Sequence, residues 1–466
     1  MYPEMDSTGA APPDGVIGGI GLSGAGWIGS SSDRGGWMSA FVKAIPLANH
    51  LIRRHPLYYG RFRRLLAETE SASLGERQAL AARLLERSCA WAGALPGYAG
   101  VDLQRPLPEQ PILVKDKLQD RANDFQVNTW LPAAHAETGG TTGIPLQLVR
   151  SIQSLVMEQA MIDHIAAKSG VDLRHCRVAV LRGDAIKDPN DNQPPFWRAF
   201  GRDRLVLSSN HLNAANYRHF EQALLDFRPD VLLAYPSSLE LLTDLAGERR
   251  STIRFKLVIT SSENLRTGVR HRVRAVFDAT LVDYYGMAER VCAAYSMEDG
   301  VYRFVFPYGY AEMVPAEAGR YRIVGTGFWN RLQPLRRYDT EDIAILQEAT
   351  TPEQLERVTL GIDAFTGIQG RSTDYLKLAD GSRIYTLDMV FHGLIGAASV
   401  QLVQESLEAA TLVIVPNARF SDATVELVRQ NFYAKAPRSM KLRVEVRDSP
   451  FRLANGKAPG FLSNLK

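Results

Sequence analysis

The sequence predicts an α/β protein: a large N-terminal domain with a mostly parallel βα sheet and an antiparallel subdomain, followed by a small α+β C-terminal domain. Short apolar runs alternate with helical stretches in the middle of the chain, which is typical of βαβ units around a parallel sheet. From Val301 to about Leu346 the strands become closely spaced and alternating, and a further unit follows Gly370. The four apolar runs are CRVAVLRG, DVLLAYP, FKLVITSSE and ATLVDYYG.

The segment before these runs reads as helical. From Phe41 to about Leu95 apolar residues recur every three or four positions, in LIRRHPLYYGRFRRLLAETE and ERQALAARLLERSCAWAGAL. We interpret the arginines of the first stretch as solvating the outer face of an amphipathic helix rather than as a membrane or acidic-surface patch. They stand at Arg53, Arg54, Arg61, Arg63 and Arg64.

Helices are also expected between the strands. SLVMEQAMIDHIAAKSG precedes the first strand, and NYRHFEQALLDF, SSLELLTDLAGERR and RTGVRHRVRAVF separate the later ones. In the C-terminal unit, LVQESLEAATLVIVP and KLRVEVRD predict strands, and DATVELVRQNFYAK predicts a helix between them. Ligands of such sheets bind beyond the carboxyl ends of the strands, so the loops of interest are Tyr235–Ser237, Ser261–Asn264 and Tyr284–Glu289.

Bulk composition excludes several classes of protein. The 466 residues are 45% hydrophobic and 23% charged, as in ordinary globular proteins. A formal net charge of +3 lacks the basic excess of a nucleic-acid binder, and no apolar run approaches a membrane-spanning length. Cys89, Cys176 and Cys292 are too widely spaced for a disulfide framework or a zinc site. We therefore expect a cytoplasmic protein that binds neither nucleic acid nor membrane.

Residues 1–36 differ from the rest of the chain. They contain ten of the 37 glycines, interspersed with serines and prolines, and we interpret them as a flexible tail. Gly19, Gly21 and Gly24 match the G-x-G-x-x-G pattern, but no strong strand precedes them and no helical pattern follows. The match is therefore attributed to composition. The predicted domains are 37–369 and 370–466 after this tail.

The stretch AETGGTTGIPL, residues 136–146, is rich in glycine and threonine. Its glycines and Pro145 disfavour a helix, and it has too little apolar area for a buried strand. It offers exposed backbone N–H groups and hydroxyls, which suit a polyphosphate. An ordinary surface loop is the alternative that this stretch alone leaves open.

Five motifs stand in a fixed order: TGGTTGIPL at 138, DYYGMAE at 283, RRYDTEDIA at 336, GRSTD at 370 and NGK at 455. Together they resemble the adenylate-forming superfamily of acyl-coenzyme A ligases, luciferases and peptide-synthetase adenylation domains. The chain looks most like the branch of phenylacetate–coenzyme A ligases and their capsule-biosynthesis relatives. PILVKDKLQDRANDF and LSSNHLNAANYRHFEQALLDFRPDVLLAYPSSLELL carry that part of the resemblance, which runs from about Leu74 to the end.

The resemblance implies an ATP- and Mg²⁺-dependent ligase that converts a carboxylic acid into an acyl-adenylate and pyrophosphate. Thr142 and its neighbours match the loop that holds the β- and γ-phosphates, and Glu289 matches the carboxylate that helps to hold Mg²⁺. Tyr285 matches the ring against adenine, Asp283 the acceptor near its amine, and Asp342 the carboxylate on the ribose hydroxyls. The implied nucleotide-binding positions are Thr138, Gly139, Gly140, Thr141, Gly143, Ser262, Glu263, Asp283, Tyr284, Tyr285, Gly286, Met287, Asp342 and Arg371.

Lys457 matches the lysine that a small mobile C-terminal domain brings to the substrate carboxylate and the α-phosphate. The hinge of that domain corresponds to Thr373, with Asp374 beside it. The acceptor implied is a thiol, of coenzyme A or of a carrier protein, and the acid is aromatic or otherwise compact. By analogy with the branch, the residues near the acid are His211, Tyr235, Ser237, Val291, Ala293 and Ala294.

Two departures from the family pattern keep alternatives open. Ile144 replaces the usual loop lysine, and Ala288 replaces a hydroxyl residue. An adenylating amide synthetase with an amine acceptor, and a non-catalytic relative that binds nucleotide or acyl ligand, both remain open. Taken alone, Glu289 or Asp342 would be read as a salt-bridge partner at the surface. The sequence also leaves the oligomeric state open, a homodimer included.

Overall fold

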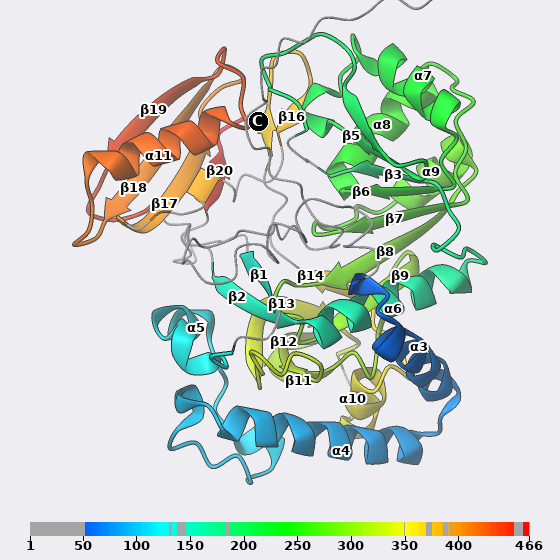
Figure 1. Cartoon of the computed structure of the whole chain (residues 1–466), viewed down its shortest axis with the longest axis vertical. Coiled ribbons are helices and arrows are strands. Elements are labelled where there is room, and N and C mark those ends of the chain that lie inside the picture. Colours follow the sequence, from blue (N-terminus) through cyan, green and yellow to red (C-terminus); the bar gives the residue numbers. More distant parts are fainter. Residues whose placement is uncertain are drawn as a thin grey trace, which may run out of the picture.

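In the computed structural model, a large sheet with its helices lies above a second, antiparallel sheet, and N-terminal helices lie below both (Figure 1). The C-terminal sheet lies to one side of the large sheet (Figure 1). The described residues are 52–129, 133–137, 146–182, 186–348, 350–369, 375–384, 390–391, 394, 396–451 and 460–465.

A large sheet forms the centre of the molecule. Its order is β10-β9-β8-β7-β6-β3-β5-β4, and the five strands from β8 to β5 are parallel. The predicted parallel sheet is therefore confirmed. The parallel strands are β3 (Val178–Leu181), β5 (Arg204–Leu207), β6 (Val231–Ala234), β7 (Leu257–Ser261) and β8 (Thr280–Gly286). The antiparallel edge strands are β4 (Trp197–Phe200), β9 (Ala293–Glu298) and β10 (Val301–Phe304).

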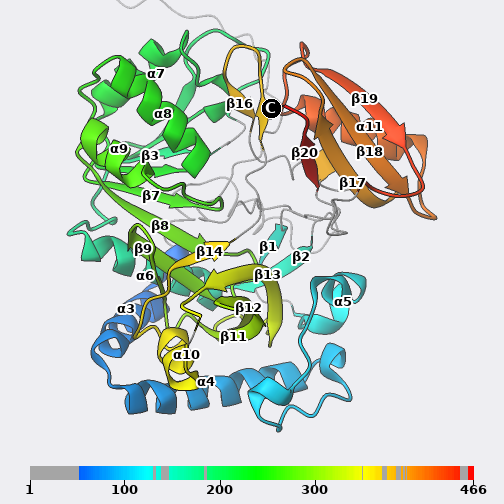
Figure 2. The same cartoon turned by 180° about the vertical axis from the view of Figure 1, so that it is seen from behind.

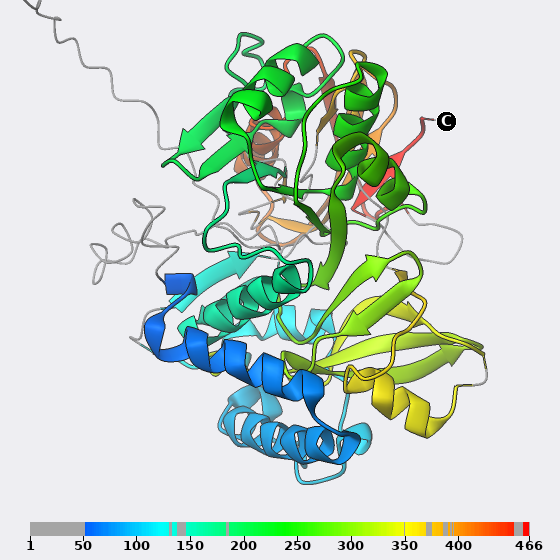
Figure 3. The same cartoon turned by 90° about the vertical axis from the view of Figure 1, so that its right-hand side faces the viewer.

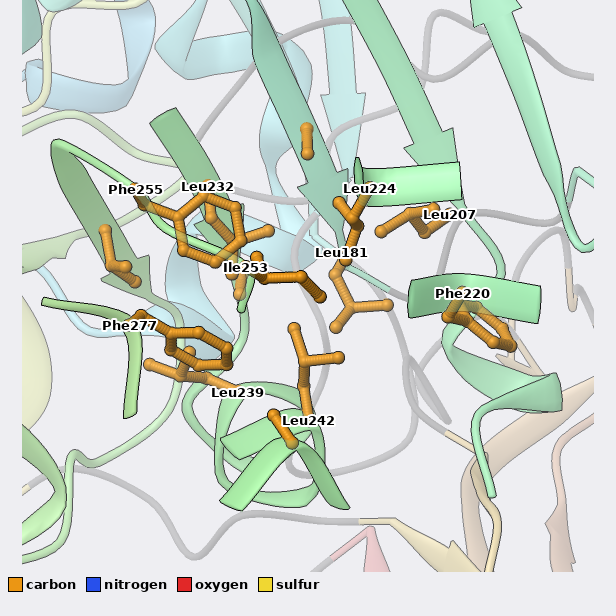
Figure 4. Packing of buried hydrophobic residues seen from close by; sticks show 14 of the residues in the cluster. Leu181, Leu207, Phe220, Leu224, Leu232, Leu239, Leu242, Ile253, Phe255 and Phe277 are labelled. Carbon is orange, nitrogen blue, oxygen red and sulfur yellow. The ribbon is translucent and has the colours of Figure 1, made fainter. Parts of the chain in front are cut away.

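Helices cover both faces of this sheet, which explains why its strands are continuously apolar. α7 (Tyr217–Phe227), α8 (Pro236–Glu248) and α9 (Val269–Phe277) pack on one face. α3 (Pro56–Ser71) and α6 (Ile152–Lys168) pack on the other, side by side in Figure 3. Alternate strand residues serve the two faces, as with Leu232 toward α8 and Leu233 toward α6. Figure 4 shows the first face, where Leu181, Leu232 and Leu242 belong to one cluster that also contains phenylalanine rings.

A second, antiparallel sheet has the order β11-β12-β13-β14. Its strands are β11 (Gly309–Glu317), β12 (Arg320–Gly327), β13 (Tyr338–Ile345) and β14 (Gly367–Gln369). The sequence assigned everything from Val301 to Leu346 to this subdomain, but β10 pairs with β9 and so belongs to the large sheet. The chain changes sheets between Phe304 and Gly309, in the segment VFPYG, whose proline and glycine mark the break between the two strands.

Smaller elements complete the N-terminal part. β1 (Ala133–Glu137) and β2 (Gln147–Ser151) form an antiparallel hairpin, and α4 (Leu74–Gly93) starts with a capping box at Ser73 and Glu76. The remaining helices are α5 (Lys115–Asp120), α10 (Pro352–Thr359) and the 3₁₀ turns η1 (Pro96–Tyr98), η2 (Leu107–Glu109), η3 (Ala122–Phe125) and η4 (Ser209–His211).

The C-terminal sheet has the order β19-β18-β17-β20 and its own hydrophobic cluster. Its elements are β17 (Ala397–Gln404), β18 (Ala409–Pro416), α11 (Asp422–Tyr433), β19 (Lys441–Val446) and β20 (Phe461–Ser463). A short hairpin, β15 (Leu376–Lys377) and β16 (Arg383–Ile384), lies between this sheet and the α7–α8 side of the large sheet (Figure 2). Within the described ranges, no helix combines the length and apolar character needed to cross a membrane.

We expect the core in Figure 4 to dominate stability. Leu242 of α8 is 0% exposed within it, so Leu242→Ala removes buried apolar atoms and leaves a cavity. The free energy of unfolding, measured by urea denaturation, should fall by about 2–5 kcal/mol. Leu57→Ala is the control because Leu57 is 75% exposed, and it should stay within about 0.5 kcal/mol of wild type. Equal losses in the two variants would contradict the packing described.

Candidate functional site

Three of the loops predicted to matter lie at one edge of the large sheet. β6, β7 and β8 are adjacent and parallel, and they end at Ala234, Ser261 and Gly286. Their registers place Ala234 beside Thr260 and Ser261 beside Tyr284. The segments that begin at Tyr235, Ser262 and Met287 therefore leave the sheet side by side, as the parallel arrangement predicts.

Glu263 links the loop after β7 to the start of α8. Its Oε2 accepts hydrogen bonds from the Ser237 backbone N at 2.9 Å and from Ser237 Oγ at 2.5 Å. The side chain of the N-cap residue, Tyr235, makes no capping hydrogen bond to the first turn of α8. Glu263 provides that contact instead, and a carboxylate is favoured at a helix N-terminus. Burial raises the pKa of Glu263 to about 7, against hydrogen bonds from Ser237 that lower it. Ser262, just before it, is exposed and has a φ of +72°, a strained conformation for a residue with a side chain.

Asp283 lies within β8, beside Thr260 of β7, and accepts hydrogen bonds from two hydroxyl groups. Thr260 Oγ1 donates to its Oδ1 at 2.7 Å, and the Tyr302 hydroxyl donates to its Oδ2 at 2.5 Å. The residue is 4% exposed, and burial raises the pKa of its carboxyl group. Each of the two carboxylate oxygens thus accepts one hydrogen bond from a hydroxyl group of the same sheet, and each has a second lone pair that could accept another.

The motifs at 283 and 336 meet through two tyrosine hydroxyls. Tyr285 donates to Asp342 Oδ2 and Tyr338 donates to Glu289 Oε1, each at 2.8 Å. Asp342 of the second motif is therefore bound by a tyrosine of the first motif, and Glu289 of the first motif by a tyrosine of the second. The order of residues in β8 sends Tyr284 to the opposite face, where it is 3% exposed among the residues of the α6 side.

Gly286 and Met287 connect this pair of contacts. A Cβ on Gly286 would lie 2.2 Å from the Tyr284 hydroxyl, so only glycine fits at the end of β8. Met287 is half-buried and packs against the antiparallel sheet. The turn is therefore shaped by packing as well as by polar contacts.

A buried charge cluster lies directly behind Glu289. Glu158 of α6 is 0% exposed and pairs with Arg53, 3.2 Å from Arg53 Nη1 to Glu158 Oε2, and with Arg290. Burial would raise the pKa of Glu158, but Arg290, Arg53 and Arg150 together hold it below its usual value. We call Arg53, Arg150, Glu158 and Arg290 the arginine cluster.

Arg150 joins the arginine cluster to the residue before Glu289. Its Nε and Nη2 donate to the Ala288 carbonyl oxygen at 3.0 and 2.6 Å. Burial, and then the charge of Arg290, lower the pKa of Arg150 to about 9. Because Arg290 is fixed to Glu158, both sequence neighbours of Glu289 are held by buried arginine contacts.

Arg150 also belongs to β2, the strand that follows the glycine- and threonine-rich loop. Asn330 and Gln333 hold that strand: Gln333 Oε1 accepts from Val149 N at 3.0 Å, and Asn330 Nδ2 donates to Val149 O at 2.8 Å. Glu137 of β1 lies opposite Gln147 of β2, so the loop between them starts and ends at paired strand positions. The loop itself lies outside the described residues.

The arginine cluster corrects one prediction from the sequence. Arg53 is 3% exposed, and Arg54 makes a bidentate pair with Asp163 at 2.8 and 2.9 Å. These two arginines therefore bind carboxylates of α6 instead of solvating an outer helix face. Their partners lie about a hundred positions away in the sequence, where helical periodicity gives no signal.

The residues predicted near the acid divide into two groups. His211, Tyr235 and Ser237 lie after β5 and β6, on the side approached by the β15–β16 hairpin. The other three are at most 1% exposed and pack inside hydrophobic clusters, so their role as substrate contacts stays a prediction; they are Val291, Ala293 and Ala294.

Several predicted residues lie outside the described part of the chain. These are Thr138, Gly139, Gly140, Thr141, Thr142, Gly143, Ile144, Arg371, Thr373, Asp374 and Lys457. Conversely, sequence reasoning missed contributors at the edge of the sheet. The missed residues are Arg150, Glu158, Arg182, Arg290, Tyr302 and Tyr338. Tyr338 lies within the motif at 336 and Arg290 directly follows the motif at 283, so both could have been identified from the sequence. Arg182 follows β3, where no motif marks it.

Among the described residues, Glu289 is the carboxylate that could help to hold a magnesium ion. Among them, no group of three or more His, Cys, Asp or Glu side chains is placed to hold a metal ion. Glu289 is half-buried, and its Oε1 accepts the hydrogen bond from Tyr338. A single carboxylate oxygen suits Mg²⁺ that takes its other ligands from phosphates and water.

Comparison with known proteins gives remote structural likenesses alone. No protein-family model matches the chain, and no curated protein matches it. A 2-hydroxyisobutyryl-CoA ligase in complex with 2-HIB-AMP and CoA shares 16% identity over 84% of this chain and 91% of that chain, with a TM-score of 0.48. An acyl-CoA synthetase of Brucella canis shares 14% identity over 70% of this chain and 62% of that chain, with a TM-score of 0.33.

A third structure, the anthranilate CoA ligase AuaEII in complex with anthranoyl-AMP, shares 12% identity over 70% of this chain and 66% of that chain, with a TM-score of 0.29. At such identities, and with TM-scores below 0.5, these likenesses establish neither a family nor an activity for this chain.

We expect the arginine cluster to depend on its one carboxylate. Glu158→Gln leaves three buried guanidinium groups without a counter-charge, so the free energy of unfolding should fall by about 3–5 kcal/mol in urea denaturation. Glu68→Gln is the control because Glu68 is exposed on α3, and its effect should stay within about 0.5 kcal/mol. A Glu158→Gln variant as stable as the control would show that the cluster is not held by charge.

Glu263 should make stability depend on pH. Its pKa is raised in the folded state, so between its ordinary pKa near 4.5 and about 7 the native carboxyl holds a proton that the unfolded chain releases. The free energy of unfolding therefore falls as pH rises through this window. Glu263→Gln should flatten that part of the profile of thermal midpoint against pH. An unchanged slope in the variant would contradict the raised pKa.

Proposed function

We propose that this protein activates a carboxylic acid as an acyl-adenylate, using ATP and Mg²⁺, and then transfers the acyl group to a thiol. The observation that carries the proposal is the meeting of the motifs at 283 and 336, where Tyr285 contacts Asp342 and Tyr338 contacts Glu289. Two carboxylates and an aromatic ring thus converge at the carboxyl edge of a parallel sheet, the usual place for a nucleotide in such a fold.

The reaction needs no redox partner. An oxygen of the acid attacks the α-phosphorus of ATP, the bond from that phosphorus to the bridging oxygen breaks, and pyrophosphate leaves with its electrons. In the second step a thiolate sulfur attacks the acyl carbon, and AMP leaves with the oxygen. Both steps build negative charge, which fixed cations and N–H donors stabilise.

The described residues supply positions for the nucleotide. We assign the ribose hydroxyls to Asp342 and the adenine ring to Tyr285, which together form one connected polar surface. Glu289 is assigned to the magnesium ion, which would neutralise phosphate charge when bound. Its carboxylate is directed by Tyr338, and its backbone by the arginine contacts of Ala288 and Arg290.

Ala288 is compatible with this assignment despite the missing hydroxyl. Arg150 binds the Ala288 carbonyl oxygen, so the backbone position does not depend on the side chain at 288. The phosphate contact of a hydroxyl side chain is still lost. We assign the β- and γ-phosphates to the loop residues Thr138, Gly140, Thr141, Thr142 and Gly143, and the α-phosphate region to Arg371.

The C-terminal part, residues 370–466, is proposed to be a separate domain that brings Lys457 to the site. Its hairpin β15–β16 reaches the large sheet at two points: Asn213 Nδ2 donates to Asp380 Oδ2 at 2.7 Å, and Arg383 Nη1 donates to Ser237 O at 3.2 Å. Two such hydrogen bonds are weak enough to exchange during a domain rotation. Coenzyme A or a carrier protein is the proposed source of the thiol, and an aromatic or compact acid the substrate.

Pyrophosphate release tests the proposal. With ATP, Mg²⁺ and a panel of aryl, cyclic and aliphatic acids, wild type should release pyrophosphate with one class of acid. Lys457→Ala and Glu289→Gln should each lower kcat by at least about 100-fold, because Lys457 would stabilise charge on the α-phosphate and Glu289 would hold the magnesium ion. A coupled colorimetric assay follows the rate.

Matched controls separate chemistry from folding. Lys441→Ala removes an exposed lysine of β19, and Glu298→Gln changes an exposed carboxylate at the end of β9; both should keep the wild-type rate. ATP binding without pyrophosphate release from any acid would favour a non-catalytic nucleotide-binding protein. An amide product in the presence of amines would instead favour an amide synthetase.

A further inference from the structure

The order of strands marks one position along the carboxyl edge of the large sheet. β3 lies between β5 and β6, so the chain passes from β3 to one side for β5 and then crosses to the other side for β6. Ligands of open α/β sheets bind where the strand order reverses in this way. The segments that flank this switch point are η4 after β5 and the first turn of α8 after β6.

η4 carries three consecutive side chains with unsatisfied polar atoms. Ser209 Oγ, Asn210 Oδ1 and His211 Nε2 are buried and have no hydrogen-bond partner among the described residues. The three residues are 1%, 9% and 3% exposed. A buried polar group that stays unpaired destabilises the folded state, so three in a row at a switch point indicate a ligand or ordered water.

The ring of His211 is held in a fixed orientation. Its Nδ1 lies 2.7 Å from Ser208 Oγ, and the ring stacks on Phe196 with the centroids 5.2 Å apart. Nε2 therefore points away from Ser208, and it makes no hydrogen bond of good geometry although the Asp188 backbone lies nearby. Burial and the charge of Lys187 lower the pKa of His211, so the ring is neutral at pH 7 and can serve as a single donor or acceptor.

Further polar residues lie at the strand ends next to η4. Arg182 follows β3, is 8% exposed and donates to Ser261 Oγ at 2.7 Å. The β15–β16 hairpin bridges the two flanks, through Asp380 to Asn213 beside η4 and through Arg383 to Ser237 in α8. A wholly apolar acid would leave the η4 atoms unpaired beneath this hairpin.

We propose that the acid taken by this protein carries a hydroxyl or amino substituent, which Ser209, Asn210 and His211 bind. The inference rests on the proposed function and narrows its substrate to hydrogen-bonding compact acids. A hydroxyl group can donate to Asn210 Oδ1 or accept from Ser209 or His211, so such a substituent can pair with an atom that an unsubstituted acid leaves unpaired. Sites built this way discriminate strongly against analogues that lack the group.

Matched pairs of acids test this directly: 4-hydroxybenzoate with benzoate, and 3-hydroxybutyrate with butyrate. In wild type, kcat/KM for pyrophosphate release should favour the hydroxylated member of at least one pair by about 100-fold or more. Ser209→Ala and Asn210→Leu should each reduce that preference to below about 10-fold, because each lowers kcat/KM for the hydroxylated acid more than for its unsubstituted partner.

Ser88→Ala is the control, because Ser88 is 0% exposed on α4 and its Oγ is also unpartnered, but it lies far from η4. It should leave the preference at the wild-type value. If hydroxylated and unsubstituted acids react equally in every pair, or if Ser209→Ala and Asn210→Leu retain the preference, the inference is overturned while the proposed function stands.

Thermal shift with each acid alone gives a readout that needs no catalysis. A rise in Tm with a hydroxylated acid, absent with its unsubstituted partner and lost in Ser209→Ala, supports the binding site even when no pyrophosphate is released. That outcome would remove catalysis from the proposed function and keep η4 as the site that binds the substituent of the acid. Equal shifts from both members of every pair, or no shift from any acid, would overturn it.

Discussion

A single buried carboxylate organises the region around the candidate site. Glu158 can remain charged inside α6 only because Arg53 and Arg290 neutralise it, and those two arginines come from opposite ends of the N-terminal part of the chain. Arg150 extends the cluster to β2 and to the Ala288 carbonyl oxygen. Helix α6, the strand after the glycine-rich loop and the turn that carries Glu289 are thereby fixed relative to one another.

At the same edge of the sheet, alternate residues of a strand point either into the hydrophobic core or toward the candidate site. Alternation along β8 sends Tyr284 into the core and Tyr285 toward Asp342, so adjacent tyrosines have different environments. Asp283 and Thr260 satisfy each other within the sheet, whereas Glu263 caps a helix just beyond it. Carboxylates near the strand ends are therefore directed by hydroxyl and amide donors, and the unpaired atoms of η4 stand out against that background.

Local sequence patterns predicted most of the elements, and long-range pairing accounts for what they missed. The strands β3, β6, β7 and β8 and the helices α7 to α9 follow from apolar runs and helical spacing. β5 was not among the apolar runs singled out from the sequence, although at four residues it is as long as β3 and β6. β10 was placed in the wrong sheet because a strand's own sequence does not specify its pairing partners. Motifs singled out Glu289 and Asp342, but nothing local indicates that Arg150 binds residue 288 or that Arg53 is buried.

The transfer of oxygen from acid to nucleotide tests the central claim most directly. With an acid whose carboxyl group carries ¹⁸O, acyl-adenylate formation followed by transfer to a thiol must leave one labelled oxygen in AMP. Mass spectrometry of AMP after turnover with coenzyme A should therefore find a single ¹⁸O atom per molecule. Unlabelled AMP, or ADP in its place, would show that the acid is not activated by adenylation and would contradict the assignment of this site.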